Sequence, residues 1–250
     1  MLQRYDFLKA ANEASLFSSD KFRAMGELME ELCSALAAKG VRWAVSMSFG
    51  LFLRGAHDHF NDFDLLIDPR DTAKFEAVFE SLGGTINHET IQKPAFTSPY
   101  YKEAEMRGVK FDLIADITIE TYGTVYRYEL KEVEWFTLRH DLNIPVIPAE
   151  GQYILYYMMT AWEARRVFKT EITAAYLKAK GVKFPDVFKR ALEGTELYSE
   201  KYGKETNWQL PEDLRLRIAG MLAELWNSPR FKRASGDLFL ARFGSKSINM

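Results

Sequence analysis

Apolar residues recur every three or four positions across residues 19–38, and this period predicts an amphipathic helix. Ser18 or Ser19 can cap its start, and Gly40 stands where a glycine commonly ends a helix. The apolar face is made by Phe22, Met25, Met29, Leu32 and Leu36. The first clear element is therefore a helix that packs against a core.

Short apolar runs bounded by glycine, proline and acidic residues follow, as is typical of strands joined by turns and helices. Pro69 and Asp71 favour the start of a helix, and Gly83 and Gly84 favour its end. The expected elements are strands in 41–48, 62–68, 104–119 and 124–130, a short helix or turn in 48–55, and a helix in 70–84.

The pattern changes at residues 143–152, where two prolines bracket a short extended segment. Every strong pattern beyond this segment has the period of a helix. We therefore expect an α+β protein, with an α/β domain in residues 1–147, which include the first helix, and a helical C-terminal domain in residues 148–250. The expected C-terminal helices span residues 149–168, 170–180, 185–202, 211–226 and 229–243.

The composition limits the class of protein. Of the 250 residues, 47% are hydrophobic, which is enough for a sizeable core, and the net charge of −2 requires no polyanionic partner. Cys33 is the only cysteine in the sequence, so neither an internal disulfide nor a cysteine-rich zinc site can form. No apolar run approaches the roughly 20 residues that cross a bilayer. The N-terminus has charges where a signal peptide is apolar, so a soluble cytoplasmic protein without a membrane partner is expected.

Two acidic residues interrupt the second expected strand. Asp62 and Asp64 are two positions apart, so they share one face of a strand. Two carboxylates about 4 Å apart repel by roughly 4 kcal/mol at an effective dielectric constant near 20. Solvent removes this cost at an ordinary strand end, whereas a cation removes it in a functional site. Mg²⁺ fits best, because it takes oxygen ligands and often uses one or two carboxylates together with phosphates.

Two further features favour a functional site. Upstream, a strand ends near Met47, Ser48 follows and an apolar helix begins, so backbone N–H groups at the helix start can bind an anion. Downstream, Asp112 interrupts another apolar strand and would lie beside Asp64 if the two strands were neighbours. Three converging carboxylates beside a phosphate site are typical of two-metal phosphoryl transfer.

The order of these features resembles the DNA polymerase β-type nucleotidyltransferase superfamily. Its motif places a hydrophobic residue, Gly and then Gly or Ser before a strand of the pattern Asp-apolar-Asp/Glu-apolar. Here Met47-Ser48 takes the first position, Asp62–Leu65 follows after a short gap, and Asp112 takes the third carboxylate position. The similarity extends over residues 40–170 and is strongest to stand-alone bacterial members, such as antibiotic nucleotidyltransferases and abortive-infection toxins.

The resemblance implies a mixed sheet flanked by helices and an enzyme that moves an NMP from an NTP to a hydroxyl group, releasing pyrophosphate. It implies two Mg²⁺ ions with the bound NTP, held by Asp62, Asp64 and Asp112. Asp112 would also take the proton from the acceptor hydroxyl. The residues expected to contact the nucleotide are Ser48, Phe49, Arg54, Arg166 and Lys169.

Several of these residues also have an ordinary structural interpretation. Ser48 could cap a helix, and Arg54 could be a surface residue. The basic residues between 165 and 169 could be a solvated helix end. Asp68 and Asp116 share the strand faces of the acidic residues before them, but a capping or turn role is expected for both.

Three other segments carry candidate chemistry. His57 and His59 could bind zinc, but no third soft ligand is near, so a loop role is expected. Residues 153–162 are expected in the helix core and would form a homodimer interface only if exposed. Residues 228–236 are basic and could contact an RNA or a phosphorylated acceptor, although their short length argues against a nucleic acid partner.

Met47 departs from the family pattern, which has glycine at this position. Its side chain could crowd the phosphates, or it could point into the core while the backbone still serves. The main prediction is a Mg²⁺-dependent nucleotidyltransferase that acts on a small molecule or macromolecule, with ATP among the candidate donors. The alternatives are a catalytically degenerate nucleotide-binding homologue and a toxin that modifies tRNA or protein. The sequence identifies neither the NTP nor the acceptor.

Overall fold

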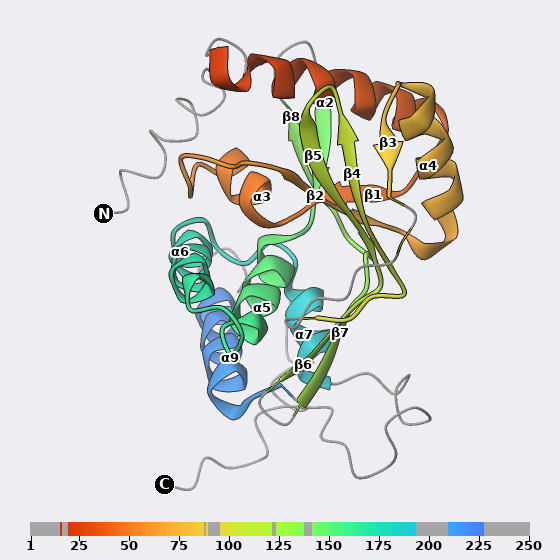
Figure 1. Cartoon of the computed structure of the whole chain (residues 1–250). Helices are drawn as coiled ribbons and strands as arrows, with labels where there is room; N and C mark the ends of the chain where they lie inside the picture. Colours follow the sequence, from red (N-terminus) through yellow and green to blue (C-terminus); the bar gives the residue numbers. More distant parts are fainter. Residues whose placement is uncertain are drawn as a thin grey trace, which may run out of the picture.

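The computed structural model describes residues 16, 20–87, 89, 96–121, 124–137, 142–193 and 210–227. These residues form a seven-stranded mixed sheet, a two-stranded sheet and helices that cover the large sheet (Figure 1). The expected α+β class, with helices following a mixed sheet, is confirmed. No helix in these ranges is long and apolar enough to cross a membrane.

Strands and helices alternate in the first part of the chain, and helices follow. The helices are α2 (Asp20–Ala38), α3 (Met47–Leu53), the 3-10 helix η1 (Pro69–Asp71), α4 (Thr72–Ser81), α5 (Ala149–Met159), α6 (Arg165–Lys180), α7 (Pro185–Glu193) and α9 (Glu212–Asn227). The strands are β1 (Trp43–Val45), β2 (Phe63–Ile67), β3 (Thr85–Ile86), β4 (Tyr100–Met106), β5 (Val109–Ala115), β6 (Ile117–Thr121), β7 (Thr124–Tyr128), β8 (Glu134–Thr137) and β9 (Asn143–Val146).

The large sheet has the strand order β3-β4-β5-β2-β1-β9-β8. β2 runs parallel to β5, and β1 runs parallel to β9, while the other neighbours are antiparallel. Asp64 on β2 lies directly opposite Asp112 on β5. The two acidic strands are therefore neighbours, as the convergence of the carboxylates requires.

The two faces of the sheet belong to two hydrophobic cores, because side chains alternate along each strand. Phe63, Leu65 and Ile67 of β2 pack in the core that includes α2 and α4. Leu66 belongs to the other core, which includes α5, α6, α7 and α9. Asp64 shares the face of Leu66 and stays half-buried. Figure 1 shows α5, α6, α7 and α9 gathered on one side of the sheet.

The segment expected to hold one strand, residues 104–119, contains parts of three. β4 and β5 form a hairpin through Arg107 and Gly108, whose φ angles of 54° and 78° suit a tight turn. Asp116 has a φ angle of 62° and separates β5 from β6. The short strands β3 and β8 were not expected from the sequence.

The expected helix over residues 149–168 is divided, since α5 ends at Met159 and α6 begins at Arg165. The helices expected over 170–180 and 211–226 are confirmed as parts of α6 and α9. Residues 194–202 and 229–243 lie outside the described ranges. The division into two domains at residue 147 stays a prediction.

Candidate active site

β2 and β5 bring three carboxylates to one region of the sheet. Asp62 lies directly before β2, Asp64 lies within it, and Asp112 lies opposite Asp64 on β5. All three side chains are half-buried. Burial, and then the negative charges of Asp62 and Asp112, raise the pKa of Asp64 to about 8. The ionised form of this cluster is therefore costly without cations.

Tyr101 fixes the orientation of one of these carboxylates. Its hydroxyl group donates a hydrogen bond to Asp112 Oδ2 at 2.9 Å. Burial and the charge of Asp112 raise the pKa of Tyr101, which keeps the hydroxyl protonated as a donor. Sequence reasoning missed Tyr101, although it lies in an alternating strand, because its partner is on the neighbouring strand β5.

The start of α6 places cations beside the carboxylates. The charges of Arg166 and Lys169 lower the pKa of Asp64, against the larger effect of burial. Glu163, which the sequence analysis also missed, accepts hydrogen bonds from Arg165 Nε at 2.7 Å and from Arg166 Nε at 2.9 Å. Glu163 therefore holds Arg165 and Arg166 of the basic cluster that the sequence predicts. The charges of Arg166 and Lys169 act on Asp64 in the acidic cluster.

Lys169 also reaches the start of α3. Its Nζ atom donates a hydrogen bond to Ser48 Oγ at 2.5 Å. Lys169 Nζ and Arg166 Cζ lie 5.8 and 5.6 Å from the centre of the Tyr156 ring. Burial lowers the pKa of Lys169, and Arg166 lowers it further, while Asp64 and Asp62 oppose the shift. The structure therefore brings Ser48, Arg166 and Lys169 together near the three carboxylates.

The turn between β1 and α3 is tied to β2. Ser46 donates to the carbonyl oxygen of Asp64 through its backbone N–H at 2.8 Å and its hydroxyl at 3.2 Å. Met47 has a φ angle of 47°, in the left-handed region, and its side chain is buried in the core of the C-terminal helices. Phe49 is also buried, with its ring centre 4.5 Å from that of Phe60. The side chains of Met47 and Phe49 therefore belong to the core, with 3% and 0% of each residue exposed, and the nucleotide contact expected of Phe49 stays a prediction.

Arg54 neither lies at the surface nor has a free guanidinium, so the structure differs from both interpretations that the sequence suggested for it. It is 2% exposed. Its Nη2 atom donates to Glu134 Oε2 at 2.8 Å and to the carbonyl oxygen of Ile147 at 2.6 Å. Its Nη1 atom donates to Gln152 Oε1 at 2.9 Å and to the carbonyl oxygen of Gly50 at 3.1 Å. Arg54 is therefore a structural residue that joins α3 to β8 and α5.

The turn roles expected for two further acidic residues are confirmed. Asp68 caps η1 by accepting a hydrogen bond from Arg70 N at 3.0 Å, and it also pairs with the Arg70 guanidinium. These bonds lower the pKa of Asp68 to about 2. Asp116 occupies the left-handed bend after β5 and pairs with Arg127 of β7.

The loop between α3 and β2 contains a second group of candidate ligands. His57 Nδ1 and His59 Nδ1 lie 3.2 and 2.9 Å from Asp58 Oδ1. Among the described residues, this is the one group of three whose ligand atoms all lie within 4.8 Å of one another. The third member of this group is the carboxylate of Asp58. Asp62, Asp64 and Asp112 are gathered less tightly.

A groove of about 440 Å³ adjoins two of the three carboxylates, Asp62 and Asp112. It lies on the open face of β3, β4 and β5. In the register of β4 and β5, Glu103 lies opposite Asp112 and Glu105 lies opposite Lys110. Asp62 and Asp112 line the groove together with Thr85, Asn87, Glu103, Ala104, Glu105, Lys110 and Phe111.

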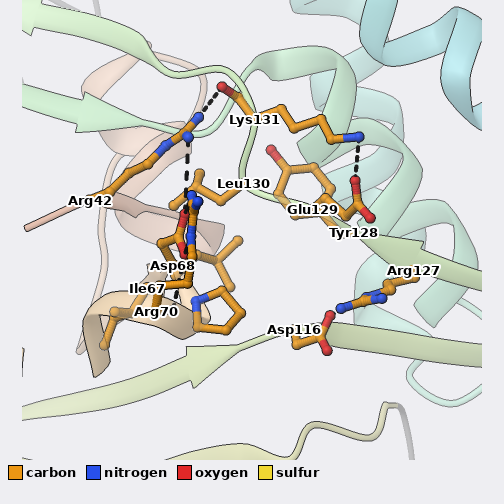
Figure 2. Close-up of a pocket in the computed structure, with 12 residues that line it drawn as sticks. Arg42, Ile67, Asp68, Arg70, Asp116, Arg127, Tyr128, Glu129, Leu130 and Lys131 are labelled. Atoms are coloured by element: carbon orange, nitrogen blue, oxygen red, sulfur yellow. Dashed lines mark hydrogen bonds and ion pairs between the residues drawn. The ribbon is translucent and has the colours of Figure 1, made fainter. Parts of the chain in front are cut away.

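A second pocket, of about 420 Å³, lies at the other end of β2 (Figure 2). It is rich in charged side chains, but they pair with one another. The ion pairs are Arg70–Asp68, Arg127–Asp116 and Lys131–Glu129. Figure 2 also shows Arg42 joined to Asp68 and to the backbone of Lys131. This pocket is separate from the three-carboxylate cluster.

The apolar run 153–162 lies mostly in the core, as the sequence predicts. Tyr153, Tyr156 and Met158 are fully buried, while Trp162 is 51% exposed. A homodimer interface at this run stays a prediction. The basic residues 228–236 lie outside the described ranges.

Neither protein-family models nor the curated proteins give a match to this chain. Among solved structures, similar chains include a protein from Thermotoga maritima assigned as a nucleotidyltransferase, with 20% identity, a TM-score of 0.48, and coverage of 58% of this chain and 91% of that one. ANT(2")-Ia, solved with adenylyl-2"-tobramycin, has 14% identity, a TM-score of 0.44, and coverage of 62% and 91%. The lincosamide adenylyltransferase LnuA, solved with lincomycin, has 17% identity, a TM-score of 0.39, and coverage of 56% and 90%.

One of these three similar chains is described as a nucleotidyltransferase and another as an adenylyltransferase. Since the identities are low and the TM-scores are below 0.5, we base the function on the side chains of this chain.

Proposed function

We propose that this chain is a Mg²⁺-dependent nucleotidyltransferase that moves an NMP from an NTP to an acceptor hydroxyl group and releases pyrophosphate. The observation that carries the proposal is the arrangement of Asp62, Asp64 and Asp112 opposite the cations of α6. A bound NTP needs both kinds of group, since its triphosphate is anionic and its metal ions require carboxylates.

The three carboxylates fit divalent cations by their chemistry. They are hard oxygen ligands, and the pKa of Asp64 is raised by burial first and then by the negative charges of Asp62 and Asp112. In the proposal, Asp62, Asp64 and Asp112 hold two Mg²⁺ ions when the NTP is bound. The ions would supply charge neutralisation at the triphosphate. The His57, Asp58 and His59 group contains nitrogen ligands and is not assigned to these ions.

The cations and the turn at Ser48 would hold the triphosphate. Lys169 and Arg166 would pair with its oxygens, and Ser48 would contribute its hydroxyl group and its N–H. Lys169 donates to Ser48 in the absence of ligand, so it would exchange this partner for a phosphate oxygen. Positioning and electrostatic stabilisation would then provide most of the rate enhancement.

Asp112 is the proposed base for the acceptor. It borders the groove over β3, β4 and β5, so a hydroxyl group that enters this groove can reach its carboxylate. Tyr101 would hold one carboxylate oxygen of Asp112 and so fix the orientation of this base. The nucleophile is the acceptor oxygen, the bond formed joins it to the α-phosphorus, and pyrophosphate leaves.

Thermal unfolding with Mg²⁺ and each of ATP, GTP, CTP and UTP tests this proposal. A ligand that binds the folded state raises the melting temperature by mass action. We expect a rise for at least one NTP that requires Mg²⁺ and disappears in Asp62→Asn/Asp64→Asn. The exposed control Glu120→Gln should keep the full rise. An equal rise in the double variant, or no rise with any of the four NTPs, would contradict the proposal.

A further inference from the structure

Met47 adopts a backbone conformation that a residue with a side chain rarely takes. Its φ angle is 47°, where an L-residue brings Cβ close to its own backbone and only glycine is free of this strain. Met47 directly precedes Ser48, whose hydroxyl group accepts the hydrogen bond from Lys169. A change at Met47 would therefore move Ser48 relative to the cations. Something must hold this conformation in place.

Gln152 on α5 makes the contact that can hold it. Its Nε2 atom donates a hydrogen bond of 2.6 Å to the carbonyl oxygen of Met47. Its Oε1 atom accepts a hydrogen bond of 2.9 Å from Arg54 Nη1. The orientation of the amide is unambiguous, because a guanidinium can only donate and a carbonyl oxygen can only accept. Gln152 is 0% exposed, so water cannot replace either partner.

The partners of Gln152 are themselves fixed. Arg54 is held by Glu134, and the other oxygen of Glu134 accepts a hydrogen bond from Lys183 Nζ at 2.6 Å. The space is also tight, since a Cβ atom at Gly50 would lie 3.1 Å from Gln152 Oε1. A chain of polar contacts therefore runs from the exposed Lys183, through the buried Glu134, Arg54 and Gln152, to the carbonyl oxygen of Met47.

We propose that Gln152 is a positioning residue for the nucleotide site: its buried amide holds Met47 in the left-handed conformation and so keeps Ser48 beside Lys169 and the three carboxylates. This inference rests on the proposed function. It also explains how this chain tolerates methionine where glycine is free of strain. With glycine at position 47, the same backbone would need no such support.

A double-mutant cycle at positions 47 and 152 tests the inference. Gln152→Glu keeps an acceptor for Arg54 but replaces the Nε2 donor by an oxygen that faces the carbonyl of Met47. We expect Gln152→Glu to weaken binding of the Mg²⁺ nucleotide by about tenfold or more, because Met47 loses the contact that holds its left-handed conformation and Ser48 moves with it. Met47→Gly should bind about as well as the wild type, and Met47→Gly/Gln152→Glu should recover most of the loss. Each of the four NTPs with Mg²⁺ is titrated by calorimetry.

Glu150→Gln provides the matched control. Glu150 lies two residues away on α5, is 1% exposed, and accepts hydrogen bonds from Lys183 N and Phe184 N. Since the Oε1 atom of glutamine can accept both hydrogen bonds, this variant should leave nucleotide affinity unchanged. An equal effect of Gln152→Glu in the wild-type and Met47→Gly backgrounds, or none in either, would overturn the inference.

Urea unfolding separates this inference from the proposed function. If the wild type binds no NTP, the proposed function fails. The double-mutant cycle can then still be measured through the free energy of unfolding of each variant. Gln152→Glu should then destabilise the wild-type protein more than the Met47→Gly protein. If Gln152→Glu does not fold, a folded Met47→Gly/Gln152→Glu protein supports the inference. Failure of both to fold would overturn it, because Gln152 would then be a general core residue.

Discussion

At the scale of single residues, the ionisation of Asp64 decides how the site behaves without ligands. Burial and two neighbouring carboxylates raise its pKa to about 8, although an unfolded Asp ionises near pH 4. Between these two values the folded chain holds a proton that the unfolded chain has lost. The stability contributed by this residue therefore falls as the pH rises from about 4 to about 8.

Asp64→Asn should accordingly stabilise the protein at pH 8 when divalent ions are absent. We expect a gain of about 1–4 kcal/mol at pH 8 and little change at pH 4, measured by urea unfolding in EDTA. Asp68→Asn is the opposite control, because pairing with Arg70 lowers the pKa of Asp68 to about 2. That variant should lose stability at pH 8. A loss of stability in Asp64→Asn at pH 8 would show that its charge is already compensated.

Lys169 is the residue through which α6 contacts the turn at Ser48. Lys169→Met keeps most of the side-chain volume and removes the charge that faces the triphosphate in the proposal. Nucleotide affinity with Mg²⁺ should fall by about tenfold or more, as expected for loss of a charge-assisted contact. Lys178→Met, an exposed lysine in the last turn of the same helix, should change it less than twofold, or about 0.4 kcal/mol. Calorimetric titration measures both, and equal affinities would contradict the assigned contact.

At the scale of elements, α5 packs closely against the two-stranded sheet of β6 and β7. A Cβ atom at Gly151 would lie 2.4 Å from Tyr128 Cε2 of β7, which is buried. Gly151→Ala should therefore destabilise the protein by about 1–3 kcal/mol through overpacking. Gly220→Ala in α9 is the control, since nothing lies within 4 Å and the helix is exposed there. It should stabilise by about 0.5–1 kcal/mol. Urea unfolding of both variants checks the contrast.

How far the sequence predicts the site depends on whether a contact is local or distant. Asp62 and Asp64 were found because alternation within one strand puts them on one face. The prediction that Asp112 lies beside Asp64 required only the assumption that the two acidic strands are neighbours. The register of β2 and β5 confirms this assumption. Gln152 was missed because its partner is 105 residues away. Arg54 was misassigned because distant segments supply the partners that allow its burial.

At the scale of the whole molecule, the candidate site draws on both parts of the chain. The sheet supplies the carboxylates, α6 supplies the cations, and α5 supplies the residue that holds the turn between them. Figure 1 shows α3 between the sheet and the C-terminal helices, where these contributions meet. The groove over β3, β4 and β5 gives access to the carboxylates of Asp62 and Asp112. The central claim is that this arrangement cleaves an NTP at its α-phosphate.

The fate of a labelled NTP tests that claim most directly. The chain is incubated with Mg²⁺, a cell extract that supplies acceptors, and the bound NTP labelled in parallel reactions at the α- or the γ-phosphate. Our account predicts that the α-label moves into an acceptor, that the γ-label is released as pyrophosphate, and that Asp112→Asn abolishes both. Transfer of the γ-label to an acceptor, release of orthophosphate with NDP, or unchanged turnover by Asp112→Asn would contradict it.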